Sequence, residues 1–310
     1  MNNLISWIQA SRLRTLPLAA ACVMIGGAIA HEKAMNSEFL ASQYWPVFWA
    51  ILMTVVLLQV LSNWANDWGD FSHGVDGEER QDRAVASGRI SAQSMKMGIR
   101  ALGFLTFLIG IATVYVSMHS SGSFALSMLM ISLGVLAIFA AYRYTAGKNP
   151  YGYYGLGDLM VMTFFGWIGV AGTAFLLTHS WEWSWLLPGT WTGALSVAVL
   201  NLNNMRDHEN DAAKGKRTLV VRMGYNQAKW YHAVCFVAAW ASWWTFVFFL
   251  ENGSWRGMEW IGIINAFHFT HLIRVFRCQE ASALDPELKR VALSTALAAF
   301  FILLAQTVQS

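Results

Sequence analysis

Long apolar runs alternate with polar segments along the whole chain. A helix needs about 20 residues to cross the hydrocarbon core of a bilayer, and fewer when its ends are anchored. Two of the polar segments are long, at about residues 63–97 and 201–229. The pattern predicts an all-α, polytopic membrane protein, a single domain over residues 1–310 with about nine transmembrane helices. The nine predicted helices are Leu16–Ala30, Val47–Ser62, Ile99–Met118, Phe124–Tyr142, Leu156–Thr178, Leu186–Leu202, Tyr231–Leu250, Met258–Ile273 and Val291–Val308.

The composition supports a membrane protein. Hydrophobic residues make up 56% of the chain and charged residues only 13%, whereas soluble domains carry about 25% charged residues. Tryptophans cluster where apolar runs end, as at Trp181, Trp183 and Trp185, which is typical of rings at the headgroup level. The net charge of +3 does not indicate nucleic acid, and the three cysteines lie too far apart to suggest a metal site or a disulfide framework.

The first apolar run has two interpretations. Basic residues precede it and small residues end it, as in a cleavable secretory signal. Leu4, Trp7 and Ile8, however, share one face of a helix with Arg12 nearby, which is typical of an interfacial helix that stays with the protein. We expect the first helix to be retained.

Lysine and arginine positions orient the bundle, because cytoplasmic loops retain positive charge. If the N-terminus is cytoplasmic, nine crossings place every Lys and Arg except Lys33 and Arg256 on the cytoplasmic side. The long polar segments also lie on that side. The sequence therefore predicts that function resides at the cytoplasmic face.

The first long polar segment begins NWANDWGDFSHGVD. If the preceding helix continues into it, Asn63, Asp67 and Asp70 share one face, with Asn66 beside them. An ionised Asp costs about 2.5–3.5 kcal/mol in a membrane helix, so such residues normally face a cavity and have a function. A solvated helix end is the alternative for this segment taken alone.

The second long polar segment repeats the arrangement. It begins NLNNMRDHENDAAKGKRT, in which Asn204 precedes Asp207 and Asp211, one helical turn apart. Basic residues lie directly before and after the acidic pair: Arg206, Lys214, Lys216 and Arg217. Two such clusters on the side selected by the charge pattern favour a functional site over two solvated helix ends.

Carboxylates and amide carbonyls are hard ligands that suit Mg²⁺, which completes its shell with water and substrate phosphates. Opposed Asp pairs with nearby Arg and Lys thus predict a site for a diphosphate bridged by Mg²⁺. No GxxxxGK[ST] loop is present, so a P-loop nucleotide site is not supported. A diphosphate with a long apolar group fits a central cavity that opens to the cytoplasmic side and continues into the bilayer. If the diphosphate is allylic, its ionisation leaves a carbocation that an acceptor can capture, so the predicted reaction is prenyl transfer.

A transporter is the alternative from another class. Carriers bear charges near the midplane and often contain broken helices, whereas these acids lie at the cytoplasmic helix ends.

An aromatic segment lies between the fourth and fifth predicted helices. Its tyrosines and phenylalanines either line a pocket for a carbocation or form an interfacial belt; they are Tyr142, Tyr144, Tyr151, Tyr153, Tyr154, Phe164 and Phe165. Asp158 either caps the next helix or orients an acceptor hydroxyl. His268 and His271 share a helix face and are interpreted as interior polar groups.

On these residues the chain resembles the UbiA-type intramembrane aromatic prenyltransferases, and most of all the branch that prenylates 1,4-dihydroxy-2-naphthoate in menaquinone synthesis. The resemblance covers nearly the whole chain. It rests on SRLRTLPLA (Ser11–Ala19), LQVLSNWANDWGD (Leu58–Asp70), GVD (Gly74–Asp76), PYGYYGLGD (Pro150–Asp158) and NLNNMRDHENDAAKGKRTLVVRMG (Asn201–Gly224).

The resemblance implies an enzyme of the bacterial cytoplasmic (inner) membrane that uses Mg²⁺. Its partners would be the bilayer, a polyprenyl diphosphate and the naphthoate, and its products demethylmenaquinone, CO₂ and diphosphate. A benzenoid acceptor such as 4-hydroxybenzoate or homogentisate is the alternative within the superfamily.

The resemblance also assigns roles to residues. Asp67, Asp70, Asp207 and Asp211 would bind the metal and carry catalysis, assisted by Asn63, Asn66 and Asn204. Lys148, Arg206, Lys216 and Arg217 would contact the diphosphate. The loop after Asp76 reads GEERQDRAVASGRIS and lacks an Arg-Gly-rich stretch found in some members, so the choice between Arg80 and Arg83 stays open.

Overall fold

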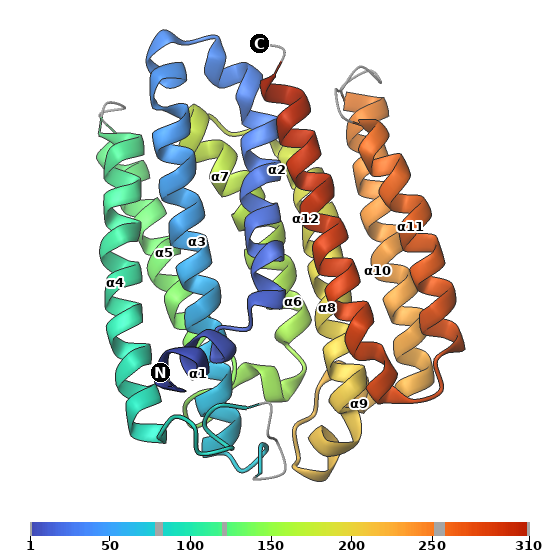
Figure 1. The fold of residues 1–310 in the computed structure, drawn as a ribbon. Helices are drawn as coiled ribbons and strands as arrows, with labels where there is room; N and C mark the ends of the chain where they lie inside the picture. Colours follow the sequence, from blue (N-terminus) through green and yellow to red (C-terminus); the bar gives the residue numbers. More distant parts are fainter. Residues whose placement is uncertain (1, 78–82, 120–122, 251–257, 309–310) are drawn as a thin grey trace.

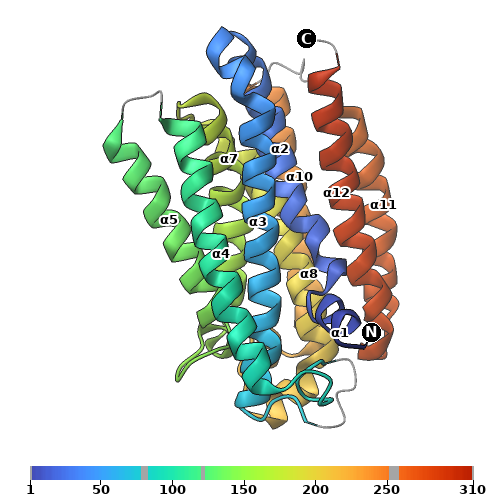
Figure 2. The ribbon, with the colours of Figure 1, turned by 60° about the vertical axis from the view of Figure 1, so that its left-hand side comes forward.

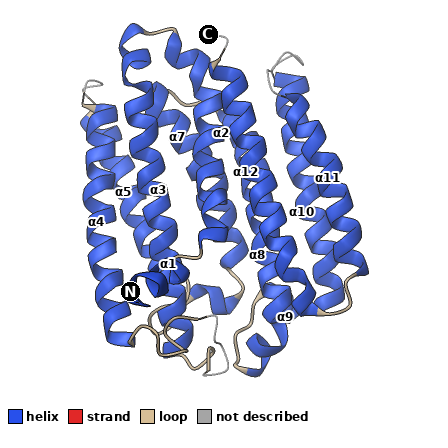
Figure 3. Ribbon diagram, in the orientation of Figure 1, coloured by secondary structure: helices blue, strands red, loops and turns tan. Residues whose placement is uncertain are grey.

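A computed structural model describes residues 2–77, 83–119, 123–250 and 258–308. Within these ranges the chain is helical and contains no strand (Figure 3). The helices form one bundle (Figure 1). They are α1 (Asn2–Ala10), α2 (Leu16–Met35), α3 (Glu38–Ser72), α4 (Ala92–Met118), α5 (Phe124–Arg143), α6 (Gly157–Val161), a π-helical segment (Met162–Ile168), α7 (Gly169–Thr178), α8 (Leu186–Ala213), α9 (Leu219–Met223), α10 (Tyr225–Thr245), α11 (Met258–Arg277) and α12 (Asp285–Thr307).

Each of the nine predicted segments is helical in the structure, so the all-α prediction is confirmed. Two helices extend further than predicted at the end that carries the acidic residues: α3 continues to Ser72 and α8 to Ala213. Among the described residues, 7 helices are long and apolar enough to cross a membrane. They do not include α8 and α11, so the number nine for the crossings stays a prediction.

Polar residues at the helix starts explain where several helices begin. The side chains of Ser37, Ser91 and Ser123 accept hydrogen bonds from the first turns of α3, α4 and α5. A serine cap satisfies one of the backbone N–H groups that a helix start leaves without an intrahelical partner. The loops therefore end at defined residues, which fixes the bounds of the bundle helices.

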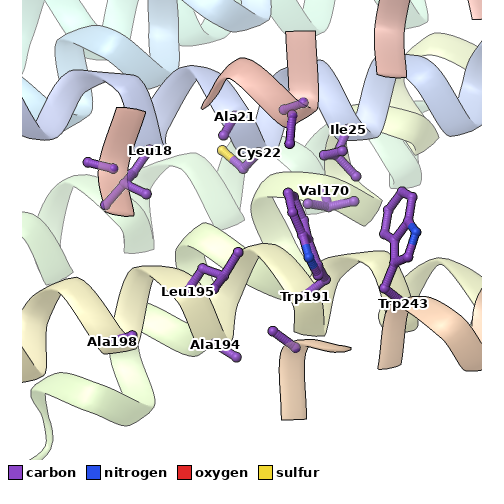
Figure 4. Packing of buried hydrophobic residues seen from close by; sticks show 14 of the residues in the cluster. Leu18, Ala21, Cys22, Ile25, Val170, Trp191, Ala194, Leu195, Ala198 and Trp243 are labelled. Atoms are coloured by element: carbon purple, nitrogen blue, oxygen red, sulfur yellow. The ribbon is translucent and has the colours of Figure 1, made fainter. Parts of the chain in front are cut away.

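Small residues bring the helices at the centre of the bundle together. Figure 4 shows Ile25 of α2 pointing toward Val170 of α7, with Trp191 of α8 beside them and Ala21 and Cys22 about one turn away along α2. A Cβ added at Gly26 would come within 2.6 Å of the Val170 carbonyl oxygen. Such close approach is how membrane helices gain packing contacts without a hydrophobic driving force between them.

Helix α1 lies at the end of the bundle where α3 and α8 finish (Figures 1 and 2). Trp7 packs on Trp64 of α3 with ring centroids 4.5 Å apart. Leu4, Ile5 and Ile8 are exposed. One face thus packs on the bundle and the other is apolar and open, as expected for an interfacial helix.

Candidate functional site

A cavity of about 350 Å³ lies between α2, α3, α4, α5, the π-helical segment, α7 and α8. Along α3 its lining extends from Asp70 to Ile51. At 1.5 Å per residue this is about 28 Å, nearly the thickness of the hydrocarbon core. A long, narrow ligand would fit a space of this shape.

Most of the cavity wall is apolar, and polar groups gather at one end. Phe164 and Phe165 of the π-helical segment line the cavity together with Tyr144 and Tyr151, which favours the pocket over the interfacial belt for these members of the aromatic set. The polar lining comes from five elements or loops: Arg12, Arg14, Asn63, Asn66, Asp70, Arg83, Asn203, Asn204 and Lys216.

Both acidic helices end in the same way. Gly74 and Gly215 adopt left-handed φ angles of 68° and 75°, and the next residue donates its N–H back to the carbonyl of the acidic residue. These bonds join Val75 N to Asp70 O at 2.9 Å and Lys216 N to Asp211 O at 2.8 Å. This C-cap reverses the chain at once, so the residues after each glycine fold back over the acidic side chains.

Lys216 joins the two acidic segments. Its Nζ lies 3.5 Å from Asp70 Oδ2 and 3.6 Å from Asp211 Oδ1. All three side chains are buried, and the lysine lies over the Tyr153 ring. Carboxylates that are far apart in the sequence thus share one cation, which is the convergence that the sequence predicted.

The protonation of this cluster follows from its burial. Burial raises the pKa of Asp211 to about 6, although Lys216 opposes the shift. Burial and the Asp70 carboxylate together raise the pKa of Tyr153, so the phenol stays protonated and donates to Asp70 Oδ1 at 2.8 Å. The Lys216 ammonium thus favours the carboxylate form of Asp211, whose pKa stays at about 6.

Among the described basic residues of the first loop, Arg83 reaches the cavity. Its Nε lies 3.1 Å from Asp76 Oδ2, its Nη2 lies 4.0 Å from Asp70 Oδ2, and its Nη1 donates to Asn66 Oδ1 at 3.2 Å. Arg80 lies outside the described residues. Asp76, the last residue of the GVD stretch, orients this guanidinium.

Asp67 and Asn63 form hydrogen bonds to the backbone of segments that pack beside α3. Asp67 accepts hydrogen bonds from the N–H groups of Ala84 and Val85, at 3.0 and 3.4 Å. Asn63 Nδ2 donates to the Ser11 carbonyl at 2.8 Å. Asp67 thus anchors the loop that carries Arg83, and Asn63 anchors the turn after α1.

Asp207 is paired within its own helix. Arg206 donates to it from Nε at 3.0 Å and from Nη2 at 2.8 Å. Asn204 is buried and lines the cavity. Asp207 and Asp211 occupy successive turns of α8, as predicted, but it is Asp211 that contacts Lys216.

Several predicted site residues do not line the cavity: Asp67, Lys148, Asp158, Arg206, Asp207, Asp211 and Arg217. Lys148 and Arg217 are exposed, so their side chains are not drawn into the polar end. Asp158 is buried and accepts a hydrogen bond from Tyr231 of α10 at 3.1 Å; it makes no cap bond at the start of α6. The histidines are interior polar groups, as interpreted: His268 contacts Ser294 and His271 contacts Glu287.

Arg12 was not predicted as a site residue, yet it lines the polar end of the cavity. Its Nη2 donates to Asn66 Oδ1, the same oxygen that Arg83 uses. Its backbone is left-handed, with φ 47° and ψ 62°, a conformation that costs a residue with a side chain about 1–2 kcal/mol. Two guanidinium groups on one neutral oxygen form a place for an anion. Arg12 lies within SRLRTLPLA, one of the stretches on which the family resemblance rests, and that stretch was the signal that could have identified it.

The carboxylate ligands at the polar end fit an Mg²⁺ ion that is held mainly by the substrate of the enzyme. Among the described residues no three His, Cys, Asp or Glu side chains are placed to hold a metal by themselves. Mg²⁺ usually takes one or two carboxylates and keeps water and phosphate oxygens as its other ligands. Asp70 and Asp211, already gathered around a cation, meet that requirement.

Comparison with known proteins places the chain among prenyltransferases. A profile of the UbiA prenyltransferase family matches residues 19–292. A 1,4-dihydroxy-2-naphthoate octaprenyltransferase of Haemophilus influenzae is 41% identical over 263 residues, which are 79% of this chain and 81% of the relative. The protein of that name in Escherichia coli is 41% identical over 230 residues, 74% of this chain and 71% of the relative.

One solved structure is similar over almost the whole length. Its description concerns digeranylgeranylglyceryl phosphate synthase in membranes. The TM-score is 0.58 with 14% sequence identity, covering 99% of both chains. At that identity the similarity extends to the fold alone.

Proposed function

This chain belongs to the UbiA prenyltransferase family, and from that premise we propose that it transfers a polyprenyl group from an allylic polyprenyl diphosphate to 1,4-dihydroxy-2-naphthoate. The acceptor follows from relatives at 41% identity that carry this activity in their names. The protein is a multi-pass membrane enzyme. We place it in the bacterial inner membrane, with the polar end of the cavity on the cytoplasmic side.

One observation supports the donor most directly. Asp70 and Asp211, from helices far apart in the sequence, meet at Lys216 where the polar end joins a long apolar cavity. The charged end suits a diphosphate and the apolar length suits its prenyl chain. Arg12 and Arg83 add guanidinium groups that bind phosphate oxygens by forked hydrogen bonds.

The reaction breaks the allylic C–O bond, and its electron pair leaves with the diphosphate. Positive charge at the polar end stabilises that leaving group as its charge develops. The ring carbon that bears the carboxylate attacks the allylic cation, and the bond to CO₂ then breaks to restore aromaticity. The product is the prenylated diol, the reduced form of demethylmenaquinone. The apolar cavity excludes the water that would otherwise capture the cation.

Members of the family are generally dependent on a divalent metal ion. In this chain Asp70, Asp207 and Asp211 would hold Mg²⁺ with Asn66 and Asn204 beside them, and the ion would supply charge neutralisation to the diphosphate. Asp67 would act on the site through the loop that carries Arg83.

The acceptor is tested by mass spectrometry of the product. Purified protein with octaprenyl diphosphate, Mg²⁺ and the naphthoate should yield a prenylated ring that has lost its carboxyl group, because carbon–carbon bond formation occurs at the carboxylated carbon. In a parallel assay 4-hydroxybenzoate should not turn over. Prenylation of hydroxybenzoate alone, or a naphthoate product that keeps its carboxyl group, contradicts the proposal.

Gly134 of α5 tests whether the prenyl chain occupies the apolar cavity. This glycine lines the cavity, and a Cβ added there meets no atom within 4 Å. In Gly134→Phe the ring should occupy space needed by the distal isoprene units. We expect kcat/KM to fall about tenfold or more for octaprenyl diphosphate, since each displaced CH₂ loses about 0.8 kcal/mol of burial, and to change less than twofold for geranyl diphosphate.

Gly262→Phe is the matched control for this substitution. Gly262 lies in α11, has equally open space around an added Cβ and does not line the cavity. It should leave both substrates unaffected. Equal losses for long and short donors in Gly134→Phe would count against a tail in this cavity.

A further inference from the structure

Asp285, the first residue of α12, lies between two arginines from different elements. Its Oδ1 accepts from Arg14 Nη1 at 2.9 Å and from Arg206 Nη1 at 2.5 Å. Arg14 lines the polar end of the cavity and Arg206 belongs to α8. One carboxylate therefore ties three parts of the chain together at the edge of the site.

Arg206 is divided between two carboxylates. Its Nε and Nη2 face Asp207 at 3.0 and 2.8 Å, Nη2 also reaches Asn203 Oδ1 at 2.8 Å, and Nη1 faces Asp285. The guanidinium thus contacts both oxygens of an aspartate that faces the proposed metal site. A cation that approaches Asp207 meets the positive charge of Arg206 at close range.

We propose that Asp285 is a positioning residue: it binds the Nη1 side of the Arg206 guanidinium and so makes Asp207 available to a divalent cation. This inference rests on the proposed function. The Asp285 carboxylate offsets the guanidinium charge, so that a metal on Asp207 does not face an uncompensated arginine. Without Asp285, Asp207 is the one carboxylate among the described residues that still pairs with Arg206, and Arg206 competes with the metal for it. Asp285 itself does not line the cavity.

A purely structural role predicts something different. Two residues further along α12, Glu287 ties this helix to α11 through His271 at 2.5 Å and Arg274 at 2.9 Å, and it does not line the cavity. Loss of Glu287 should loosen α12 without altering the metal site. Glu287→Gln therefore shows what weakening the helix contacts does by itself.

The test is binding of Mn²⁺, as a spectroscopic substitute for Mg²⁺, to the full-length protein with inorganic diphosphate present, measured by electron paramagnetic resonance. Asp285→Asn should weaken Mn²⁺ binding about tenfold, in the range of groups that orient metal ligands. The Mg²⁺ concentration for half-maximal turnover should rise by a similar factor, while KM for the naphthoate stays unchanged. Asp285→Glu should restore binding, and Glu287→Gln should lower the melting temperature but keep Mn²⁺ affinity.

A double-mutant cycle separates action through Arg206 from a general loss of negative charge. If Asp285 acts through the guanidinium, Asp285→Asn should have no further effect in an Arg206→Gln background. An equal tenfold effect in both backgrounds overturns the proposal, as does unchanged binding in Asp285→Asn. Failure of the unsubstituted protein to bind Mn²⁺ would instead contradict the metal site of the proposed function.

Discussion

Asp70→Asn is expected to lower Mg²⁺-dependent turnover at least about 10³-fold, at the upper end of what the loss of one transition-state charge contact costs. Asp70 is buried, bonded to Tyr153 and 3.5 Å from Lys216. The substitution keeps the shape of the side chain but removes the anionic oxygen that Mg²⁺ prefers. Release of diphosphate from octaprenyl diphosphate, measured together with the prenylated product, reports the effect. Asp211→Asn should behave in the same way, because Asp211 holds the opposite side of Lys216.

Glu209→Gln is the control for both aspartates. Glu209 lies on α8 between Asp207 and Asp211 but is exposed, so it should keep turnover within twofold. If Asp70→Asn retained activity within threefold of the unsubstituted protein while folding normally, the two-segment metal site would be wrong.

Lys216→Met has the second large expected effect, on stability as well as on activity. The lysine is 8% exposed and lies 3.5 and 3.6 Å from the carboxylates of Asp70 and Asp211. Removing one partner of a buried ion pair costs about 3–5 kcal/mol, because the remaining charges lose compensation. Turnover should fall at least about 10²-fold, since a cation that faces the leaving diphosphate is also lost.

Thermal unfolding with and without metal separates these effects. In chelator, Lys216→Met should melt at a lower temperature than the unsubstituted protein. Mg²⁺ with inorganic diphosphate should restore much of the loss, because the metal takes the place of the ammonium group between the carboxylates. Lys214→Met, at an exposed position of the same loop, should match the unsubstituted protein. A melting temperature that does not respond to Mg²⁺ and diphosphate would contradict a shared cation site.

The two acidic segments show what the local sequence pattern predicts and what depends on tertiary contacts. Spacing along a helix placed Asp67 and Asp70 on one face, and α3 does continue through them to Ser72. Spacing did not separate their roles. Asp67 turns to the backbone of Ala84 and Val85, whereas Asp70 faces Lys216, and that difference depends on where the following loop folds.

Basic residues show the same limit. The family resemblance assigned Lys148, Arg217 and Lys216 the same role, contact with the diphosphate. Only Lys216 is buried between carboxylates, since the left-handed Gly215 turns it back onto α8. Arg12 reaches the site from the opposite end of the chain, where no local pattern connects it with Asn66.

The sequence by itself determined the helical membrane fold and the class of chemistry, and it predicted the end of the bundle at which function resides. These properties depend on hydrophobic periodicity, on the placement of positive charge and on residue types, all of which are local along the chain. The tertiary structure decided which charges meet: Asp70 with Asp211 through Lys216, Arg12 with Arg83 at Asn66, and Asp285 with Arg14 and Arg206. Contacts between distant residues depend on how the helices pack against one another, and packing is a property of the whole bundle.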